Sequence, residues 1–379
     1  MANQRKYALV LSGGGFKGAF QIGALQYLME NGIRHNDETI VQNPKFDFIA
    51  GVSVGALNGS FMAMEDFEGL KKLWEDVKTK GPSEIYTSDL VEIKGDKIQA
   101  NFNGILKKIL PDSLFNVAFK FIFQKQKLLD AIGENFNKIK SIADSQPLRN
   151  TLMRVIKRDK FKIPFKMGFA SLVNAEYYSP MPKDFDSDEE LAKAILASAA
   201  LPMVFPYVST VTFRKDGVPI TTRNLTDGGV RNISPLYDAI SYVKENDQTA
   251  DWHFIIINCS ADEEHVDMSN TDPNVVGYAF RASNDILTNE VLANDYKIFL
   301  LINSLVEQAA LKDMTLLGSD DLPLIKFKYK VIRPNNPNDI GEDTGDTLDS
   351  RRGTLEFREF KGKEIAKREM EIANDRNWS

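Results

Sequence analysis

The chain has 379 residues, of which 43% are hydrophobic and 26% charged, so its composition is that of a globular protein and excludes a fibrous or disordered one. Its net charge of −6 has the wrong sign for a protein that binds the phosphate backbone, which excludes nucleic acid as an expected partner. The single cysteine, Cys259, cannot form an internal disulfide and suits a reducing compartment. We expect one large α/β domain over residues 1–379, with an insertion.

The N-terminal residues are polar and lead directly into a strand-like run, without the apolar stretch of a secretory signal. Nowhere does an uncharged apolar run approach the ~18 residues that are needed to span a bilayer. The sequence therefore predicts a cytoplasmic protein, with transient peripheral contact as the form of any membrane association. No pattern in the sequence indicates its oligomeric state.

Two strands that each lead into a helix are predicted near the N-terminus. A strand at 7–11 is followed by a glycine turn and by a helix whose apolar spacing ends at Gly32. A second strand at 46–50 leads through another glycine turn into a helix at 54–64. This order predicts a parallel α/β sheet, in which functional sites gather at the carboxyl ends of the strands.

The segment 82–143 differs in character and is predicted to be a helical insertion rich in lysine and phenylalanine. Between Lys94 and Lys140 there are nine lysines against four acidic residues. Its most apolar piece, 114–123, has two interpretations. It is a buried helix, or it is a lid that faces lipid, with apolar residues in the interface and lysines at anionic headgroups.

After the insertion the pattern returns to alternating strands and helices. Strands are expected at 165–173, 208–213, 221–225 and 254–258, and helices at 191–200 and from Ser234-Pro235 to Lys244. The spacing of Ser187 and Glu190 is that of a capping box, which marks the start of the first of these helices. The C-terminal part, 333–379, reads as an acidic, solvated loop at 333–353 followed by a charged closing helix.

The first glycine turn satisfies G-x-G-x-x-G at Gly13, Gly15 and Gly18, between a strand and a helix. One interpretation is a nucleotide or anion site, although the acid that a dinucleotide site needs after the second strand is replaced by Ala50-Gly51. A second is an oxyanion site, because glycines at a helix N-terminus expose backbone N–H donors. A third is a tight turn with a structural role alone.

The second glycine turn, Gly51-Val52-Ser53-Val54-Gly55, is G-x-S-x-G between a strand and a helix, the context of a nucleophile elbow. Its glycines allow the strand and the helix to pack closely, which raises the Ser53 hydroxyl at the edge of the sheet. The amide of Val54 is expected to face the same space. Ser53 as a simple N-cap between packing glycines is the alternative.

A serine hydroxyl needs a base before it acts as a nucleophile, and the chain offers three histidines. His35 is expected in a polar loop, and His253 at the end of the sheet remote from Ser53. His265 follows that strand in an acidic segment, so a triad of Ser53, Asp227 and His265 is one possibility.

A carboxylate is the other candidate base. Asp227 closes a strand-like segment and precedes Gly228 and Gly229, which places its carboxyl group at a crowded turn. Burial there raises the pKa of a carboxyl group and suits it to accept a proton from Ser53. A turn with no catalytic role remains the alternative for this segment.

Taken in order, these motifs resemble those of the patatin-like phospholipase family of serine acyl hydrolases. The matching segments are Gly13-Gly14-Gly15-Phe16-Lys17-Gly18 as the oxyanion loop, Gly51 to Gly55 as the nucleophile elbow, Asp227-Gly228-Gly229 as the aspartate turn, and the landmarks Asp144, Pro147 to Arg149, Ala197 to Pro202, Phe205-Pro206, Asn232 and Pro235. The resemblance covers about 6–75 and 142–260. The chain departs from the family pattern at Ser12, Lys17 and Tyr207, and none of these removes a catalytic group.

The resemblance implies a three-layer α/β fold with a mostly parallel central sheet flanked by helices. It also implies hydrolysis of acyl esters of phospholipid, lysophospholipid or galactolipid through an acyl-enzyme on Ser53, with Asp227 as the base and no histidine. Donors to the oxyanion are expected from Gly13, Gly14, Gly15 and Val54, with support from Lys17, Gly18, Gly51, Gly55, Gly228 and Gly229. We expect no metal or other cofactor, because amides hold the oxyanion and no His/Cys ligand cluster is apparent.

Overall fold

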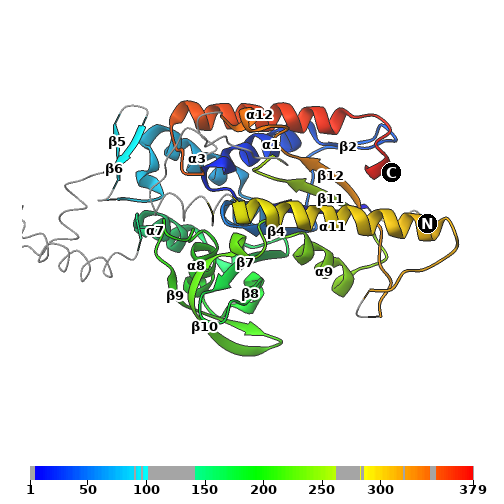
Figure 1. The fold of residues 1–379 in the computed structure, drawn as a ribbon, viewed down its shortest axis with the longest axis horizontal. Coiled ribbons are helices and arrows are strands. Elements are labelled where there is room, and N and C mark those ends of the chain that lie inside the picture. The colour runs from blue at the N-terminus through cyan, green and yellow to red at the C-terminus, as the bar shows by residue number, and fades with distance from the viewer. Residues whose placement is uncertain are drawn as a thin grey trace, which may run out of the picture.

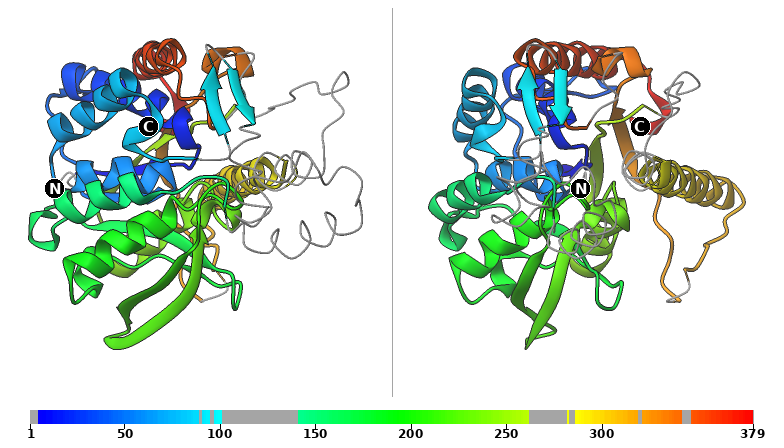
Figure 2. Two further views of the ribbon diagram at one scale, coloured as in Figure 1. Left: turned by 90° about the vertical axis from the view of Figure 1, so that its left-hand side faces the viewer. Right: turned by 60° about the vertical axis from the view of Figure 1, so that its left-hand side comes forward.

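The computed structural model describes residues 5–88, 91–94, 97–100, 141–261, 282, 286–318, 321–341 and 347–378. In Figure 1 a central sheet lies between helices, with α12 along α1 on one side and α11 crossing the other. Figure 2 shows the two helical layers from the side, with α3 and α11 on opposite sides of the sheet. The predicted three-layer α/β architecture is confirmed.

The main sheet has eight strands in the order β12-β11-β1-β4-β7-β10-β9, with β8 paired to β7. Its first five strands are parallel to their neighbours, whereas β10, β9 and β8 are antiparallel to theirs. The strands are β1 (Arg5–Leu11), β4 (Phe48–Val52), β7 (Phe165–Ser171), β8 (Tyr177–Tyr178), β9 (Val208–Lys215), β10 (Val218–Asp227), β11 (Asp251–Ile257) and β12 (Lys328–Ile332). Two short hairpins are formed by β2 (Ile33–Arg34) with β3 (Ile40–Val41) and by β5 (Val91–Lys94) with β6 (Lys97–Ala100).

Helices α1 and α2 each follow a strand through one of the predicted glycine turns. The α-helices are α1 (Gly18–Asn31), α2 (Val54–Ala63), α3 (Phe67–Lys80), α7 (Gln146–Val155), α8 (Asp188–Ser198), α9 (Leu236–Asn246), α11 (Leu287–Ala310) and α12 (Arg352–Glu371). The short 3-10 segments include η1 (Gly15–Lys17), η2 (Pro82–Glu84), η6 (Gly228–Val230), η8 (Pro337–Ile340) and η10 (Arg376–Trp378). The predicted cap of α8 is confirmed, because the Ser187 hydroxyl accepts a hydrogen bond from the Glu190 N–H at 3.2 Å.

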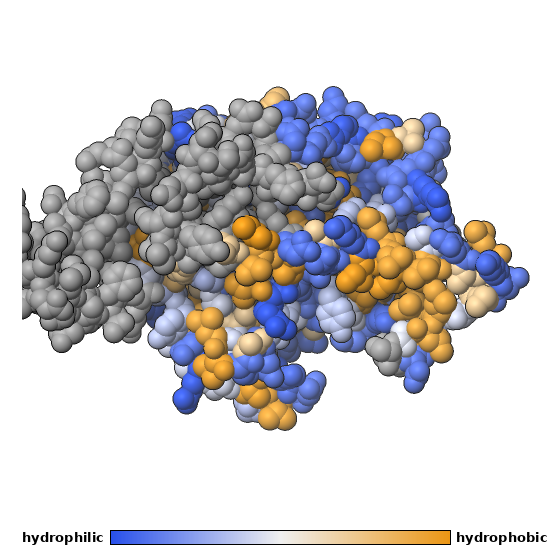
Figure 3. Space-filling model, viewed as in Figure 1, coloured by the Kyte–Doolittle hydropathy of each residue, from blue (hydrophilic) through white to orange (hydrophobic). Residues whose placement is uncertain are grey.

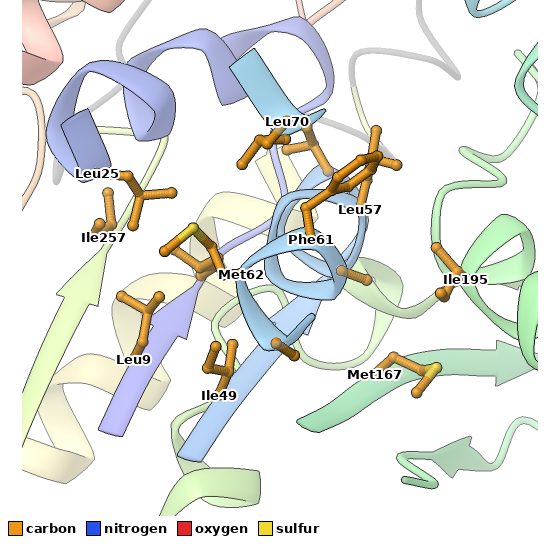
Figure 4. Packing of buried hydrophobic residues seen from close by; sticks show 14 of the residues in the cluster. Leu9, Leu25, Ile49, Leu57, Phe61, Met62, Leu70, Met167, Ile195 and Ile257 are labelled. Carbon is orange, nitrogen blue, oxygen red and sulfur yellow. The ribbon is translucent and has the colours of Figure 1, made fainter. Parts of the chain in front are cut away.

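The parallel strands are buried on both faces, so alternate residues of each strand enter two different cores. Leu9, Ile49 and Ile257 face α1 and α2, where Figure 4 shows them among the labelled side chains of those helices. Val10 and Phe254 face the other way, into a cluster with α9 and α11. The sheet is therefore rigid on both sides, which fixes the strand ends that carry the site.

The predicted insertion at 82–143 is helical only in part of what the structure describes. Its described N-terminal portion holds the turn η2 and the antiparallel pair β5–β6, and the sequence did not predict that pair of strands. The run 114–123, predicted as a buried helix or a lid, lies outside the described residues.

Several of the described residues in 333–353 are packed rather than solvated, contrary to the prediction. Ile340, Asp349 and Ser350 are buried, and the fully buried guanidinium of Arg358 in α12 donates to the carbonyls of Ile340 (2.8 Å) and Asp349 (3.0 Å). Charge content misled the prediction, because a buried arginine needs acceptors and this segment supplies them as backbone carbonyls.

Candidate active site

Ser53 lies at the sharp turn between β4 and α2 in a strained conformation. Its φ is 57° and ψ is −128°, values that a non-glycine residue adopts only when its surroundings impose them. The turn has little room, since a Cβ on Gly55 would collide with the carbonyl oxygen of Leu11 at the end of β1. The predicted elbow geometry, with glycines for close packing, is therefore present around Ser53.

Asp227 reaches the same level of the sheet from a strand that runs the opposite way. In the register of the sheet Val52 pairs with Gly168, and Asp227 pairs with the next residue, Phe169. Strand β10 therefore ends beside the point where β4 ends, and both Ser53 and Asp227 line one pocket. The structure thus brings together two residues that are 174 positions apart in the sequence.

The Asp227 carboxyl group is buried, with one oxygen held and the other unpaired. Oδ1 accepts a hydrogen bond from the Gly229 N–H at 2.7 Å. Among the described side chains, Oδ2 is one of two buried polar atoms without a hydrogen-bond partner, the other being Nδ1 of His253. An unpaired buried carboxylate oxygen is costly, so this atom is available to a proton or to a hydroxyl donor.

Burial raises the pKa of Asp227 from 3.8 to about 7, because the ionised form loses its hydration. The neighbouring Ser53 hydroxyl and the Gly229 amide oppose that rise. Ser53 lowers the pKa of the carboxyl group, although its hydroxyl forms no hydrogen bond to Oδ2. A carboxyl group whose pKa lies near neutrality is matched to proton transfer at neutral pH.

Residues at and just after the C-terminal end of α8 form hydrogen bonds with the backbone of both Ser53 and Asp227. The Ser198 hydroxyl accepts a hydrogen bond from the Ser53 N–H (2.9 Å) and donates one to the carbonyl of Gly168 (2.5 Å). The carbonyl of Ala200 accepts from the Asp227 N–H at 3.0 Å and from the Thr226 hydroxyl at 2.8 Å. The sequence marked this segment only as a family landmark, and its positioning role was missed because the partners are distant in the chain.

The first glycine turn differs from the prediction in one respect. The N–H of Gly13 donates to the carbonyl of Ile233 at 2.9 Å, so the expectation that Gly13 supplies an oxyanion donor is wrong in this conformation. No described residue accepts a hydrogen bond from the N–H of Gly14, Gly15 or Val54. Gly14 and Gly15 have φ values of 152° and 54°, which glycine adopts without strain.

The residues predicted to support the motifs belong to three turns of the structure. They sit at the two glycine turns and at the turn after β10: Lys17, Gly18, Gly51, Gly55, Gly228 and Gly229. Lys17 is 2% exposed and contributes to the pocket lining. The carbonyl of Thr347 accepts from the Phe16 N–H at 2.9 Å, so the C-terminal segment also holds this turn.

The pocket that contains Ser53 and Asp227 is lined mostly by apolar side chains. They come from α2, α3, α7, η6, the segments that follow η2, α8 and η6, and the C-terminal segment: Leu57, Leu73, Trp74, Val77, Ile85, Leu148, Leu201, Phe205, Val230, Ile233 and Leu348. Such a lining favours a long hydrocarbon group over a polar ligand. Polar groups reach the pocket from the two glycine turns and Asp227, and also from Ser260, Thr288 and Thr347.

The histidines do not join this pocket where the structure describes them. His253 is at the remote end of β11, as predicted, and pairs in the sheet with Tyr7. His35 lies in the polar loop between β2 and β3, as predicted, but its side chain is 5% exposed and shares a hydrogen bond with the Tyr7 hydroxyl at 2.7 Å. The buried hydroxyl of Tyr7 therefore holds the imidazole of His35. His265 lies outside the described residues.

Among the described residues, no three His, Cys, Asp or Glu side chains are grouped so that they could hold a metal ion. No helix in the described ranges combines the length and the apolar character needed to cross a bilayer. Cys259, expected as a core thiol, is fully buried beneath the first glycine turn.

The fold and the strained serine at a strand-to-helix turn define a class of α/β proteins with a nucleophile-elbow geometry. Residues 9–240 match the model of the patatin-like phospholipase family, and the chain belongs to that family. Among solved structures it is similar to VipD from Legionella pneumophila, at 14% sequence identity and a TM-score of 0.33, over 96% of this chain and 67% of that one. No curated protein matches the sequence.

Proposed function

We propose that the protein hydrolyses acyl esters of lipids through an acyl-enzyme on Ser53, with Asp227 as the general base. One observation carries the proposal. A strained serine and a buried carboxyl group with an unpaired oxygen line one apolar pocket at the carboxyl end of the sheet. The family supports lipid acyl hydrolysis as the general activity.

In the first half of the reaction the Ser53 hydroxyl attacks the acyl carbonyl carbon while its proton passes to Oδ2 of Asp227. The tetrahedral intermediate then collapses, the ester C–O bond breaks, and the departing alcohol takes the proton from Asp227. In the second half a water molecule gives a proton to Asp227 and attacks the acyl-enzyme. The fatty acid leaves, and the proton returns to Ser53.

Negative charge develops on the carbonyl oxygen in both halves. The N–H groups of Gly14, Gly15 and Val54 are unbonded within the described residues and stand at two helix N-termini beside Ser53. We assign them as the oxyanion donors. Loss of one such donor typically raises the barrier by about 2.7–4 kcal/mol.

The acyl chain occupies the apolar part of the pocket, whose lining includes Leu57, Trp74 and Phe205. This places the ester beside Ser53 and leaves the head group outside. Phospholipid, lysophospholipid and galactolipid all satisfy this arrangement, since they share the acyl ester and differ beyond it.

The test is mass spectrometry of the full chain after treatment with a fluorophosphonate. Labelling at Ser53, lost in Ser53→Ala and strongly slowed in Asp227→Asn, is the expected result. A protein that takes no label but binds nucleotide would instead be a binding module built on the first glycine turn. His265→Ala decides whether a histidine takes part, because the dyad mechanism requires that this variant keep its turnover.

A further inference from the structure

A stripe of exposed apolar side chains runs along α11. It consists of Leu287, Ile298, Leu301 and Leu305, which are between 45 and 61% exposed, and we call it the α11 stripe. Steps of eleven, three and four residues place all of them on one face of the helix. Figure 3 shows apolar patches along this helix, with hydrophilic atoms between them, and further apolar surface over the segment that follows it.

The orientation of α11 is fixed by its inner face. Phe299 is buried and its ring stacks on that of Phe254, with the centroids 6.4 Å apart. Asn303 donates to the carbonyl of Phe327 (3.3 Å) and accepts from its N–H (3.0 Å). Because these contacts prevent the helix from rolling, the α11 stripe cannot turn inward to bury itself.

The stripe begins at the wall of the active-site pocket. Thr288, the residue after Leu287, is part of the pocket lining. The helix also packs against η6, the turn that directly follows Asp227. A surface that covers the stripe therefore meets the pocket at the same place.

The charged residues of α11 favour an uncharged partner surface on the α11 stripe. Within α11 the charged residues are Glu290, Asp295, Lys297 and Glu307, so acids outnumber bases three to one. Anionic headgroups would find little attraction here, whereas the apolar side chains need no charge on the partner.

The shape of the apolar surface favours a lipid layer over a second helix. Beyond the end of α11 it continues through Leu311, Met314 and Leu317, which are 83, 58 and 57% exposed in a non-helical segment. An interface between α11 and the same helix of a second copy would end where the helix ends. The polar side chain of Asn294 would also interrupt that interface in the middle. A lipid surface accepts any apolar group at the right depth.

We propose that the α11 stripe is the surface on which the protein lies on a membrane of neutral phospholipid, with the axis of α11 in the membrane plane and the pocket wall at the lipid. The choice of occupant rests on the proposed lipid acyl hydrolysis. The binding itself does not need catalysis, so it can be measured apart from it.

Binding is measured by sedimentation of the full chain with phosphatidylcholine vesicles, in a Ser53→Ala background so that no lipid is consumed. The stripe variant carries Ile298→Ser, Leu301→Ser and Leu305→Ser. The matched control replaces three apolar residues of similar exposure on other elements: Val218→Ser, Phe360→Ser and Ile372→Ser. We expect the stripe variant to bind about tenfold more weakly or worse, the control to bind like its parent, and salt to change little.

The same substitutions with Ser53 intact connect docking to turnover. We expect loss of activity on vesicles, with activity on a soluble p-nitrophenyl ester kept within about twofold. Equal vesicle binding by stripe variant and parent overturns the proposal, as does failure of the parent to bind. A lipid-free dimer that the stripe substitutions dissociate also overturns it, because a second copy then covers the face. If no ester is hydrolysed but the stripe variant still loses binding, the docking surface stands and the proposed function fails.

Discussion

The hydroxyl of Ser198 accepts a hydrogen bond from the backbone N–H of Ser53 at 2.9 Å, which fixes the proposed nucleophile from outside its own turn. The same hydroxyl donates to the carbonyl of Gly168 on β7, the strand between those that carry Ser53 and Asp227. Ser198 is thus a positioning residue, and the strain at Ser53 is maintained by a helix that contributes no reacting group.

Ser198→Ala should lower the free energy of unfolding by about 1–3 kcal/mol, because a buried donor and a buried acceptor lose their partner. It should also lower kcat by about tenfold with little change in KM, since the hydroxyl touches no substrate. Denaturant titration and steady-state kinetics measure the two effects. Ser60→Ala, which removes another fully buried hydroxyl from α2, is the matched control and should cost stability alone. A Ser198→Ala enzyme with unchanged kcat would refute the positioning role.

The pKa of Asp227, about 7, predicts the pH dependence of the reaction. A base must be ionised to accept a proton, so kcat/KM should rise with pH, reach half its maximum at about pH 7 and then level off. A soluble ester assayed across the range gives the profile, and Asp227→Asn should remove it together with most of the activity. A profile with its midpoint near the ordinary carboxyl pKa would argue that another group is the base.

The free energy of unfolding should fall with rising pH, whereas kcat/KM should rise. Because the folded pKa of Asp227 is raised above its value in the unfolded chain, the folded state holds the proton more tightly. Stability is therefore lost as the pH rises from about 4 to about 7, by at most about 4 kcal/mol. Asp227→Asn should be more stable than the parent at about pH 8, and the difference should shrink toward pH 4. Denaturation of both proteins at several pH values tests this, and a constant difference would contradict it.

Local patterns were sufficient to predict much of the fold and the centre of the site. The glycine turns around Ser53 and before α1 are dictated by neighbouring residues, so spacing alone placed them correctly. The hydrogen bond from Gly13 to Ile233 was not predictable, because it joins residues 220 positions apart and no side chain announces it. The same holds for Ser198, whose partners come from two other elements.

The C-terminal part was predicted less well for a related reason. The sequence patterns did not predict helix α11 or strand β12, and the acidic composition of 333–353 suggested a loop exposed to solvent. Two of its buried residues, Ile340 and Asp349, supply carbonyls to Arg358, a charged side chain whose need for acceptors becomes visible only when α12 is in place. Hydropathy describes how a residue meets water, but a buried cation is satisfied by carbonyls that any residue can supply.

A buried chain of amides connects the apolar pocket to the first glycine turn. Trp74 donates to Oδ1 of Asn58 (2.9 Å), Asn58 donates to Oε1 of Gln21 (2.8 Å), and Gln21 donates to the carbonyl of Ser12 (2.8 Å). Asn58→Leu should lower the free energy of unfolding by about 1–3 kcal/mol for each group left unpaired. Because Trp74 lines the pocket, the variant should also change the preference among p-nitrophenyl esters of different acyl length.

Gln26→Leu is the control for that variant, since it removes a side-chain amide whose hydrogen bond to Glu30 lies on the surface of α1. It should change neither stability nor acyl preference. Loss of stability in Asn58→Leu with the acyl profile intact would mean that the chain of amides supports the fold but does not shape the pocket.

At the other end of the sheet, two imidazoles hold the C-terminal Trp378 in place. The ring of His35 stacks on Trp378 with the centroids 5.3 Å apart, and that of His253 meets it edge-on at 4.7 Å. The indole N–H donates to the carbonyl of Arg34 at 2.9 Å. His253 also bonds Asp251 at 3.1 Å, which fixes one imidazole while Tyr7 fixes the other.

Burial lowers the pKa of His35 from 6.5 to about 4, and the neighbouring His253 and Arg5 act in the same direction. Burial lowers the pKa of His253 as well, against the opposing effect of Asp251. Since His35 is neutral in the folded state and charged in the acidic unfolded chain, its contribution is complete above about pH 6.5 and is lost as the pH falls toward 4. The lowered pKa of His253 acts in the same sense. For His35 this amounts to at most about 3 kcal/mol.

His35→Phe keeps an aromatic ring against Trp378 but cannot bind a proton. It should be less stable than the parent at neutral pH, because the Tyr7 hydroxyl loses its partner, yet its stability should fall less steeply between about pH 6.5 and 4. Denaturant titrations at matched pH values, followed by tryptophan fluorescence, give both slopes. The same variant tests whether the two ends of the sheet are energetically independent. Turnover of a soluble ester at neutral pH should stay within about twofold of the parent. Parallel pH curves for the two proteins would show that His35 is not the group whose protonation destabilises the fold.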